Sequence, residues 1–477
     1  MANNILYSSN DGGIYKSANF MTDTVAWTPL NNGYLTSMFY TVALDHATPN
    51  DSTIIGGLQD NNSWFVNSKN PQKIWSPVFF GDGSYCAVAN NKLNYYFSIQ
   101  NGKMQKMQLD AAGNVLARRR IDPIGGKGYQ FVNPYILDPN NNNRIYLAGG
   151  KNLWRNDSLN IIILQNPSLS GGWDSISTGW TKFSDTVPTT GATITALAVS
   201  KQPANVLYYG TSNKKVYRIN NANVGTPAAV DITGSAFPNN ANVSCIAIDP
   251  TNAKKVMVAF SNYSVYSIFY SANADSTVPT WIKVAGNLEQ NSNTTGTGNG
   301  PSVRWVSMMP VSGGTVFLAA TSTGVYATDS LLGASTLWAQ QGATTIGNAI
   351  CDMIDFRISD GLVVVATHSH GIYTTNITSK NDVVSVHEIS NDELQMTNYP
   401  NPFSNSTTIR FTLSKNSKVK LNIYDMNGRL IQTLADKELS SGEHRLEFSS
   451  GNISTGIYYC VLRSGEAIET RKMIILK

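Results

Sequence analysis

Short apolar segments followed by polar turns recur along the first 378 residues of the chain. Each segment starts a unit of four predicted strands, of which the first two are apolar on both faces and the last two alternate more. Asn, Asp, Gly and Pro stand at the junctions between strands. A period of roughly 45–55 residues with four strands per unit predicts the blades of a β-propeller. The first strands begin near Tyr40, Ser84, Asn133, Ile194, Val243, Val303 and Ile350.

Both ends of this repeat region, residues 1–378, are incomplete. Residues 5–30 have the pattern of the second, third and fourth strands of a blade, without a first strand. The last unit, residues 350–378, shows three strands and no clear fourth. The N-terminal segment therefore either closes the last blade or belongs to an eighth blade that starts upstream of residue 1. We predict seven blades, with eight as the alternative.

A different pattern follows the repeats. Residues 379–395 are polar and predict a linker, and residues 396–477 contain about seven short strands with regular alternation of apolar and polar positions. The Asn-Gly pair within residues 426–429 predicts a tight hairpin turn. About 80 residues of such strands are typical of a small Ig-like β-sandwich.

Composition and charge exclude one class of function. Charged residues make up 14 % of the chain and the net charge is +4, without a long basic run. The short run Arg118–Arg120 predicts a solvated strand or turn, because charge runs usually face water. Nucleic-acid binding would need a concentrated basic stripe, so we expect no nucleic-acid partner. We also expect no cofactor.

Cysteines and apolar runs limit the remaining classes. Cys86, Cys245, Cys351 and Cys460 include no close pair, so we expect buried thiols and neither a zinc site nor a disulfide. No segment is apolar over the length of a membrane span, and residue 1 is followed by polar sequence without the pattern of a signal peptide. If the protein is exported, we expect this chain to be a mature form or a fragment.

Four stretches resemble a known propeller family. SSNDGGIYKS, GGLQDNNSW and FFGDGSYCAV occur in order, and ATHSHGIYTT follows at the end of the last repeat. These stretches resemble the sortilin-like and BNR (Asp-box) propellers of bacterial exported proteins, a group that includes xyloglucanase-like glycoside hydrolases. The Asp-box itself is degenerate, because SANADSTVPTW before Trp281 lacks the regular glycine. Proteins with this fold include hydrolases and binding proteins, so the resemblance implies the fold and leaves the function open.

The C-terminal segment resembles the type A sorting domain of the type IX secretion system of Bacteroidota. The matching elements occur in the order of the family over the whole segment. They are Tyr399, Pro400, Asn401, Pro402 and Phe403 at the start, then Tyr424, Asp425 and Gly428, then Gly442 and His444, then Gly456 and Tyr458, and finally Lys472 to Lys477. The resemblance implies passage through the type IX machinery, and therefore a protein that is secreted or anchored at the outer-membrane surface.

Carboxylates provide the weak candidates for catalysis. Glycoside hydrolysis needs two carboxylates that face one cleft, and Asp60, Asp82 and Asp355 are the candidates near strand ends or turns. Asp352 and Asp355 are three positions apart in a strand, so we do not expect both to face the channel. Asp before Gly or Asn is commonly a turn residue, which is the simpler interpretation of Asp60 and Asp82.

Histidines and tryptophans provide the candidates for ligand binding. His368 and His370 share one strand face, but no third ligand is evident, so we expect no metal site. Trp64, Trp173 and Trp305 lie outside the regular fourth-strand position and are weak candidates for contact with a ligand, with packing between blades as the alternative. Together these features favour a surface protein that binds a polysaccharide or a protein. The alternative is a xyloglucanase-like or sialidase-like glycoside hydrolase, or a C-terminal fragment of one.

Overall fold

In the residues that it describes, the computed structural model consists of antiparallel sheets joined by turns and six 3-10 helices, so the all-β prediction is confirmed. It describes residues 5–10, 13–31, 36–71, 73–169, 171–184, 186–189, 191–289, 298, 300–383, 394–413, 416–426, 428–464 and 467–477. The chain divides into two compact units at residues 386 and 387, which lie within the segment predicted as a linker, residues 379–395. Residues 384–393 of that segment lie outside the described residues.

Seven sheets between residues 39 and 376 make up most of the first unit. We call these seven sheets the seven-sheet unit. The first three sheets contain β4 (Phe39–Leu44), β5 (Thr53–Leu58), β6 (Ser63–Asn67), β7 (Ser76–Phe79); β8 (Gly83–Val88), β9 (Tyr95–Ile99), β10 (Lys103–Leu109), β11 (Val115–Arg120); β12 (Tyr135–Asp138), β13 (Asn141–Gly149), β14 (Asn152–Asn156) and β15 (Trp180–Lys182). The next two contain β16 (Ile194–Val199), β17 (Leu207–Thr211), β18 (Val216–Ile219), β19 (Val230–Asp231); β20 (Val243–Asp249), β21 (Asn252–Phe260), β22 (Ile268–Ser271) and β23 (Ile282–Lys283). The last two contain β24 (Val303–Val311), β25 (Gly314–Thr321), β26 (Gly324–Thr328), β27 (Ala339–Gln341); β28 (Cys351–Arg357), β29 (Leu362–Thr367) and β30 (Ile372–Asn376).

Short 3-10 helices occupy several of the connections. They are η1 (Asn90–Lys92), η2 (Gln100–Gly102), η3 (Leu159–Ile161), η4 (Gly286–Leu288), η5 (Gly333–Ser335) and η6 (Lys380–Asp382).

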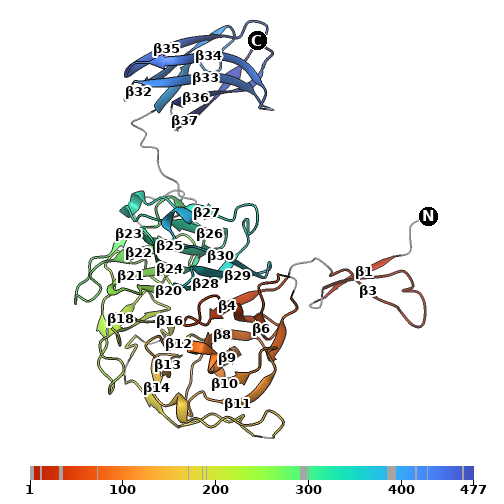
Figure 1. The fold of residues 1–477 in the computed structure, drawn as a ribbon, viewed down its shortest axis with the longest axis vertical. Helices are drawn as coiled ribbons and strands as arrows, with labels where there is room; N and C mark the ends of the chain where they lie inside the picture. Colours follow the sequence, from red (N-terminus) through yellow and green to blue (C-terminus); the bar gives the residue numbers. More distant parts are fainter. Residues whose placement is uncertain are drawn as a thin grey trace. The chain divides into compact units, whose positions relative to one another are not determined.

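The first strands of the seven sheets form a closed series. β4 contacts β8, and the contacts continue through β12, β16, β20 and β24 to β28, which contacts β4 again. Figure 1 shows these strands gathered near the centre of the unit. Every sheet therefore has two neighbouring sheets, and the apolar faces of its strands are covered from both sides. The burial of all six residues of β5 and all five of β17 follows from this arrangement.

Tryptophans join successive sheets at the position where the sequence predicts a fourth strand. Trp180 Nε1 donates to the Ile121 carbonyl oxygen at 2.7 Å. Trp281 Nε1 donates to Ile232 O at 2.8 Å, and Trp338 Nε1 donates to Val284 O at 2.9 Å. Each acceptor follows the last strand of the preceding sheet, so each indole satisfies its polar atom while its ring covers the boundary between two sheets.

The last sheet is joined to the first by side chains of β28. Asp355 Oδ2 accepts a bond of 3.0 Å from Leu44 N, and Asp355 Oδ1 lies 2.8 Å from His46 Nε2. The guanidinium group of Arg357, only 1 % exposed, donates to the Asp45 carbonyl at 3.0 Å and to the Asp51 carbonyl at 2.8 Å. These bonds tie residues about 310 positions apart and close the series of sheets.

The N-terminal strands do not complete the last sheet of the seven. β1 (Leu6–Asn10), β2 (Gly13–Ser17) and β3 (Thr28–Pro29) pair only with one another among the described strands, in the order β1-β2-β3. The idea that this segment closes the last sheet is therefore wrong, because β28 already contacts β4 and β30 pairs with β29 alone. The side chains of Leu6 and Tyr7 are exposed, unlike those of the corresponding second strands.

The C-terminal unit contains two antiparallel sheets that share one hydrophobic core. The sheets have the orders β31-β32-β35 and β34-β33-β36-β37. Side chains from both sheets, such as Phe411 and Cys460, belong to the same buried cluster. The strands are β31 (Leu394–Tyr399), β32 (Ser406–Leu413), β33 (Ser417–Asp425), β34 (Leu430–Leu439), β35 (Gly442–Ser449), β36 (Gly456–Ser464) and β37 (Ala467–Ile475).

We predict that Arg357→Leu destabilises the seven-sheet unit by about 3 kcal/mol, because it removes the buried guanidinium that donates to the Asp45 and Asp51 carbonyls and pairs with the carboxylate of Asp360. Thermal unfolding followed by calorimetry measures this change. Lys254→Leu is the control, since its ion pair with Asp275 is about half exposed, and we expect a change below about 0.5 kcal/mol. Equal effects of the two variants would contradict the role of Arg357.

The pair of His46 and Asp355 predicts a dependence of stability on pH. Desolvation by the surrounding protein opposes protonation of His46, but the carboxylate of Asp355 outweighs it and raises the pKa of His46 above its ordinary value of 6.5. The contribution of the pair is therefore complete below pH 6.5 and is lost as the pH rises through the raised pKa. The side chain of His46 is 53 % exposed, so the contribution is at most about 1 kcal/mol.

Melting temperatures measured from pH 5 to pH 8 test this dependence. We expect a small fall for the unaltered chain and a flatter profile for His46→Gln. Parallel profiles for the two proteins would show that the pair does not contribute.

Candidate functional site

A β-bulge interrupts the beginning of six of the seven first strands described above. The register shifts leave one extra residue, which is Tyr40 in β4, Arg304 in β24 and Asp352 in β28. The other bulges lie at Thr195 in β16, at Ser244 in β20 and between Gly83 and Cys86 in β8. A bulge turns the side chain of the extra residue out of the regular alternation of the strand. The same irregularity, repeated around the unit, directs several side chains toward one region.

That region is a pocket with a volume of about 430 Å³, which we call the central pocket. Four of its side chains are aromatic, namely Tyr40, Tyr85, Tyr263 and Trp305. The remainder are polar apart from Val132 and Met353, and all come from the starts of first strands or from the adjoining turns. They are Thr41, Val132, Ser244, Ser261, Ser302, Arg304, Asp352 and Met353.

The charged groups of the central pocket neutralise one another. Arg304 Nη1 forms an ion pair with Asp352 Oδ1, and His368 Nδ1 lies 3.0 Å from the other carboxylate oxygen. The ring of His368 also lies beside that of Tyr40, with 5.7 Å between ring centroids. The pocket therefore combines aromatic faces with a fixed, paired set of charges.

Carboxylates also lie around Tyr40. Burial raises the pKa of the Tyr40 phenol above its usual value, and the carboxylates of Asp82, Asp60 and Asp352 add to the increase. Asp60 lies in a turn with a φ of 55°, and its backbone N–H donates to Asp82 Oδ1 at 2.7 Å. Two of the predicted candidates, Asp60 and Asp82, thus lie on adjoining turns near the pocket, and Asp82 stabilises the turn of Asp60.

The third predicted carboxylate, Asp355, has a different position. It faces β4, where it bonds Leu44 and His46 as described above. Asp352 and Asp355 therefore lie in different places: Asp352 lines the central pocket, and Asp355 joins the last sheet to the first.

The three predicted tryptophans are separated in the structure. Trp305 lines the central pocket and also contacts two hydrophobic clusters. Trp64 packs against the cluster that joins the first and last sheets, and its Nε1 donates to Asn61 O. Trp173 lies under the guanidinium group of Arg118, at 4.1 Å from the ring centroid. Only Trp305 therefore lies in the pocket.

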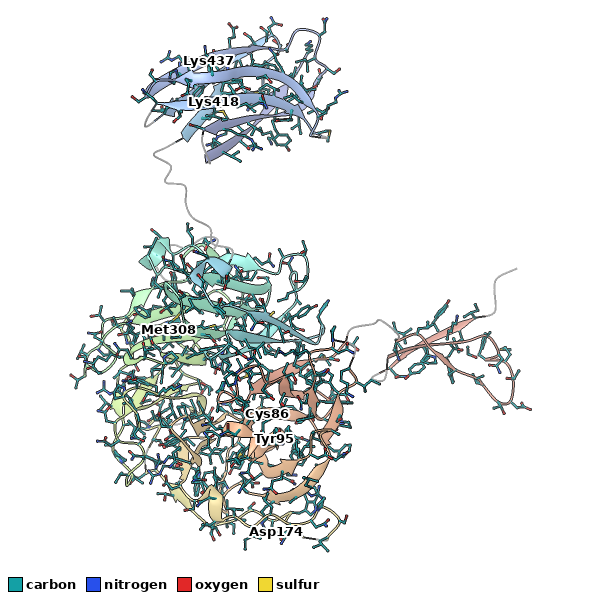
Figure 2. The ribbon with its side chains drawn as sticks, in the orientation of Figure 1. Cys86, Tyr95, Asp174, Met308, Lys418 and Lys437 are labelled. Carbon is teal, nitrogen blue, oxygen red and sulfur yellow. The ribbon has the colours of Figure 1, made fainter. Side chains whose placement is uncertain are left out.

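The candidate metal ligands and the cysteine thiols lie among the described residues. No group of three or more His, Cys, Asp or Glu side chains there has a geometry that would hold a metal ion. The four cysteines are free and buried, and burial raises the pKa of each thiol to about 12. Cys86 lies on β8 among closely packed side chains of the second sheet (Figure 2).

Sequence reasoning missed Arg304 and the tyrosines Tyr40, Tyr85 and Tyr263 as pocket residues. A signal for the bulges is present in the sequence, because a polar residue occupies the second position of VSCIAI, VRWVSM and CDMID. These residues are Ser244, Arg304 and Asp352. A polar side chain at the same place in successive buried strands indicates a position that does not face the core.

The start of the predicted sorting signal is bound to the last strand of the chain. Asn401 Nδ2 donates to Lys472 O and Asn401 Oδ1 accepts from Ile474 N, both at 2.8 Å. Phe403 N donates to Ile474 O at 3.0 Å, and Leu476 N donates to Phe403 O at 2.9 Å. Asn401 and Phe403 thus satisfy four successive backbone groups along the free edge of β37.

Most other motif residues of this unit support its fold. Tyr458 is buried, and Lys477 N donates to Thr455 Oγ1 at 3.1 Å. Asp425 holds the turn that follows β33, since its carboxylate accepts from Arg429 N at 3.0 Å. Further structural positions are Gly428 and Gly442, with φ of 78° and 120°, and His444, whose ring stacks on Phe411. Asn427 of the predicted hairpin lies outside the described residues.

Comparison with known proteins identifies the C-terminal unit. Residues 397–476 match the family model Por_Secre_tail, described as a secretion system C-terminal sorting domain. The chain ends in a type IX secretion sorting domain. A protein with this domain is exported and is either secreted or attached at the outer-membrane surface of a Bacteroidota-type bacterium. A search of curated proteins found no match.

One solved structure that resembles the whole chain is PorZ of Porphyromonas gingivalis, described as an essential bacterial surface component of the type IX secretion system. The identity is 16 % and the TM-score is 0.46, and the alignment covers all of this chain and 64 % of PorZ. The chain therefore spans less than two thirds of the length of that protein. Among the described residues, no helix has the length and apolar character needed to span a membrane.

Proposed function

We propose that the chain is an exported surface protein whose seven sheets are the blades of a β-propeller that binds a polysaccharide in the central pocket. The observation that supports this proposal is the convergence of Tyr40, Tyr85, Tyr263 and Trp305 on one open pocket. The sorting domain would deliver this binding unit to the outside of the cell.

A saccharide fits the chemistry of the pocket better than other small ligands. Aromatic faces can stack on the C–H surface of a sugar ring, and hydroxyl groups of tyrosine and serine can bond its hydroxyls. The positive charge of Arg304 is already paired with Asp352, so the pocket offers no unpaired cation that would select a strongly anionic ligand. Its volume of about 430 Å³ lies within the usual range of small-molecule sites, about 300–1,000 Å³.

A glycoside hydrolase is the second candidate. The carboxylates of Asp60, Asp82 and Asp352 all help to raise the pKa of Tyr40, so all three lie in the neighbourhood of this side chain. Two carboxylates that flank one bond are the groups that hydrolyse glycosides. A protein partner is the third candidate, because the pocket opens between exposed turns such as that of Tyr263, which is 65 % exposed.

We predict that Tyr263→Ala weakens polysaccharide binding by about tenfold, or about 1.4 kcal/mol, because it removes one exposed aromatic face from the pocket. The full chain would be tested against xyloglucan, mixed-linkage β-glucan, galactomannan and polygalacturonate. Binding and the release of reducing ends would be measured in the same samples. Tyr7→Ala is the matched control, since Tyr7 is a similarly exposed tyrosine, 62 % exposed, outside the pocket.

Each outcome separates the candidates. Binding that Tyr263→Ala weakens and Tyr7→Ala does not would support the proposal. Release of reducing ends that Asp82→Asn abolishes would identify a hydrolase. Equal loss of binding in both tyrosine variants, or no binding to any of the four polysaccharides, would contradict a saccharide site in this pocket.

A further inference from the structure

The two sheets of the C-terminal unit present outer faces of different character. On the three-stranded sheet, the outward positions form polar cross-strand pairs, such as Arg410 beside Arg445 and Thr412 beside Glu443. Tyr399 is the one large apolar side chain among the outward positions of this sheet that the structure describes. This face has the composition expected for the solvated side of an antiparallel sheet.

The outer face of the four-stranded sheet is apolar and aromatic at the end where Tyr424 lies, whereas its other end carries charged side chains such as Lys420 and Asp436. One cross-strand row consists of Leu430, Tyr424, Tyr459 and Lys472. Leu430 is 50 % exposed and Tyr459 is 38 % exposed. In the next row toward the end of β37, Ile457, which is 40 % exposed, lies beside Ile474. We call these six residues the tyrosine face.

The core of the unit does not explain the tyrosine face. The inward positions of the same strands, including Ile423, Tyr458 and Met473, already fill the space between the two sheets. Tyr424 makes a bond within its own face, since Asn422 Nδ2 donates to its hydroxyl at 2.9 Å. Adjacent exposed apolar side chains on a small stable unit indicate a surface that contacts another molecule.

The edge of the same sheet cannot bind another molecule near the end of β37, because its backbone groups there are already bonded. Asn401 and Phe403 occupy the backbone groups of Lys472 and Ile474 in β37 and of Leu476 just after it, as described above. A partner therefore cannot extend the sheet by adding a strand along this part of β37. The tyrosine face, which these bonds leave uncovered, is the available surface beside the C-terminus.

Two sequence motifs of the sorting domain meet on this face. Tyr424 belongs to the motif that ends β33, and Lys472 begins the motif at the C-terminus. The register places Tyr459 directly between them, opposite Tyr424 on one side and opposite Lys472 on the other. Residues that are 48 positions apart in the sequence therefore form one continuous surface with a cation at its end.

We propose that the tyrosine face is the surface by which the secretion machinery recognises the sorting domain. The partner would be a machinery protein with an apolar groove for Tyr424 and Tyr459 and an acidic side chain opposite Lys472. This inference rests on the proposed role of the C-terminal unit as the export signal. Aromatic side chains near a single charge are typical of the residues that dominate binding at protein interfaces.

The test uses the full chain, preceded by a periplasmic leader peptide, in a bacterium with a working type IX system. The double variant Tyr424→Ser with Tyr459→Ser removes the centre of the face. Arg410→Ser with Arg445→Ser is the matched control, because it removes a cross-strand pair of large side chains from the other sheet. We expect the first variant to reduce the amount of protein on the cell surface and in the medium by about tenfold, with accumulation in the periplasm. We expect the control to leave export unchanged.

A chain without residues 397–477 separates failure of this inference from failure of the export role. Export of that truncated chain would show that the C-terminal unit is not the signal. Retention of the truncated chain with normal export of the tyrosine variant would overturn only the proposed face.

Folding and self-association are checked on the purified proteins. If the tyrosine variant does not fold, Lys472→Glu replaces it. The Lys472 side chain is exposed, so its charge can be reversed without disturbing the core. Normal export of the Lys472→Glu variant would overturn the proposal. The oligomeric state of both proteins is measured by light scattering. If the unaltered chain is a dimer and the tyrosine variant is a monomer, the face binds a second copy of the chain, and the proposal is overturned.

Discussion

The seven-sheet unit depends on the contact between its last sheet and its first. Each sheet buries its apolar faces against its neighbours, so a series with two open ends would expose one whole face at each end. The bonds from Asp355 and Arg357 to the backbone of residues 44 to 51 provide the specific part of this contact. The hydrophobic cluster that includes Phe39, Val364 and Ala366 provides the apolar part. Because the joined residues are far apart in the chain, the contact can form only when all the intervening sheets are in place.

The same ring creates the candidate site. First strands that converge on a common centre bring their starting residues together, and a bulge in most of them turns one side chain toward that centre. The core and the pocket are therefore built from the same strands: residues such as Val303 and Cys351 fill the core, while Arg304 and Asp352 face the pocket. Substitution of Arg304 or Asp352 would therefore alter the pocket without removing an apolar side chain from between the sheets.

The sequence predicted the strands well because their apolar runs and polar turns are local features. The first strands begin within a few residues of the predicted positions, and the tryptophans at Trp180, Trp281 and Trp338 occupy the predicted part of each sheet. The pocket was harder to predict, because it depends on bulges and on which strand starts meet in space. Trp173 shows the limit: its place outside the regular fourth-strand position made it a candidate for ligand contact, and only the structure shows that its ring also stacks on Arg118 of the neighbouring sheet. The sorting motif was recognised as a whole, whereas the division between its structural residues and its surface residues required the register of β33, β36 and β37.

The buried cysteines have a consequence for the order of events during export. An exported protein of this kind crosses an oxidising compartment, where four accessible thiols would form disulfides, including wrong ones. In the folded chain each thiol is enclosed, and its high pKa leaves almost none of the reactive thiolate. Protection therefore exists only after the sheets have formed. The folded sheets therefore shield the thiols from the chemistry of that compartment as well as building the core.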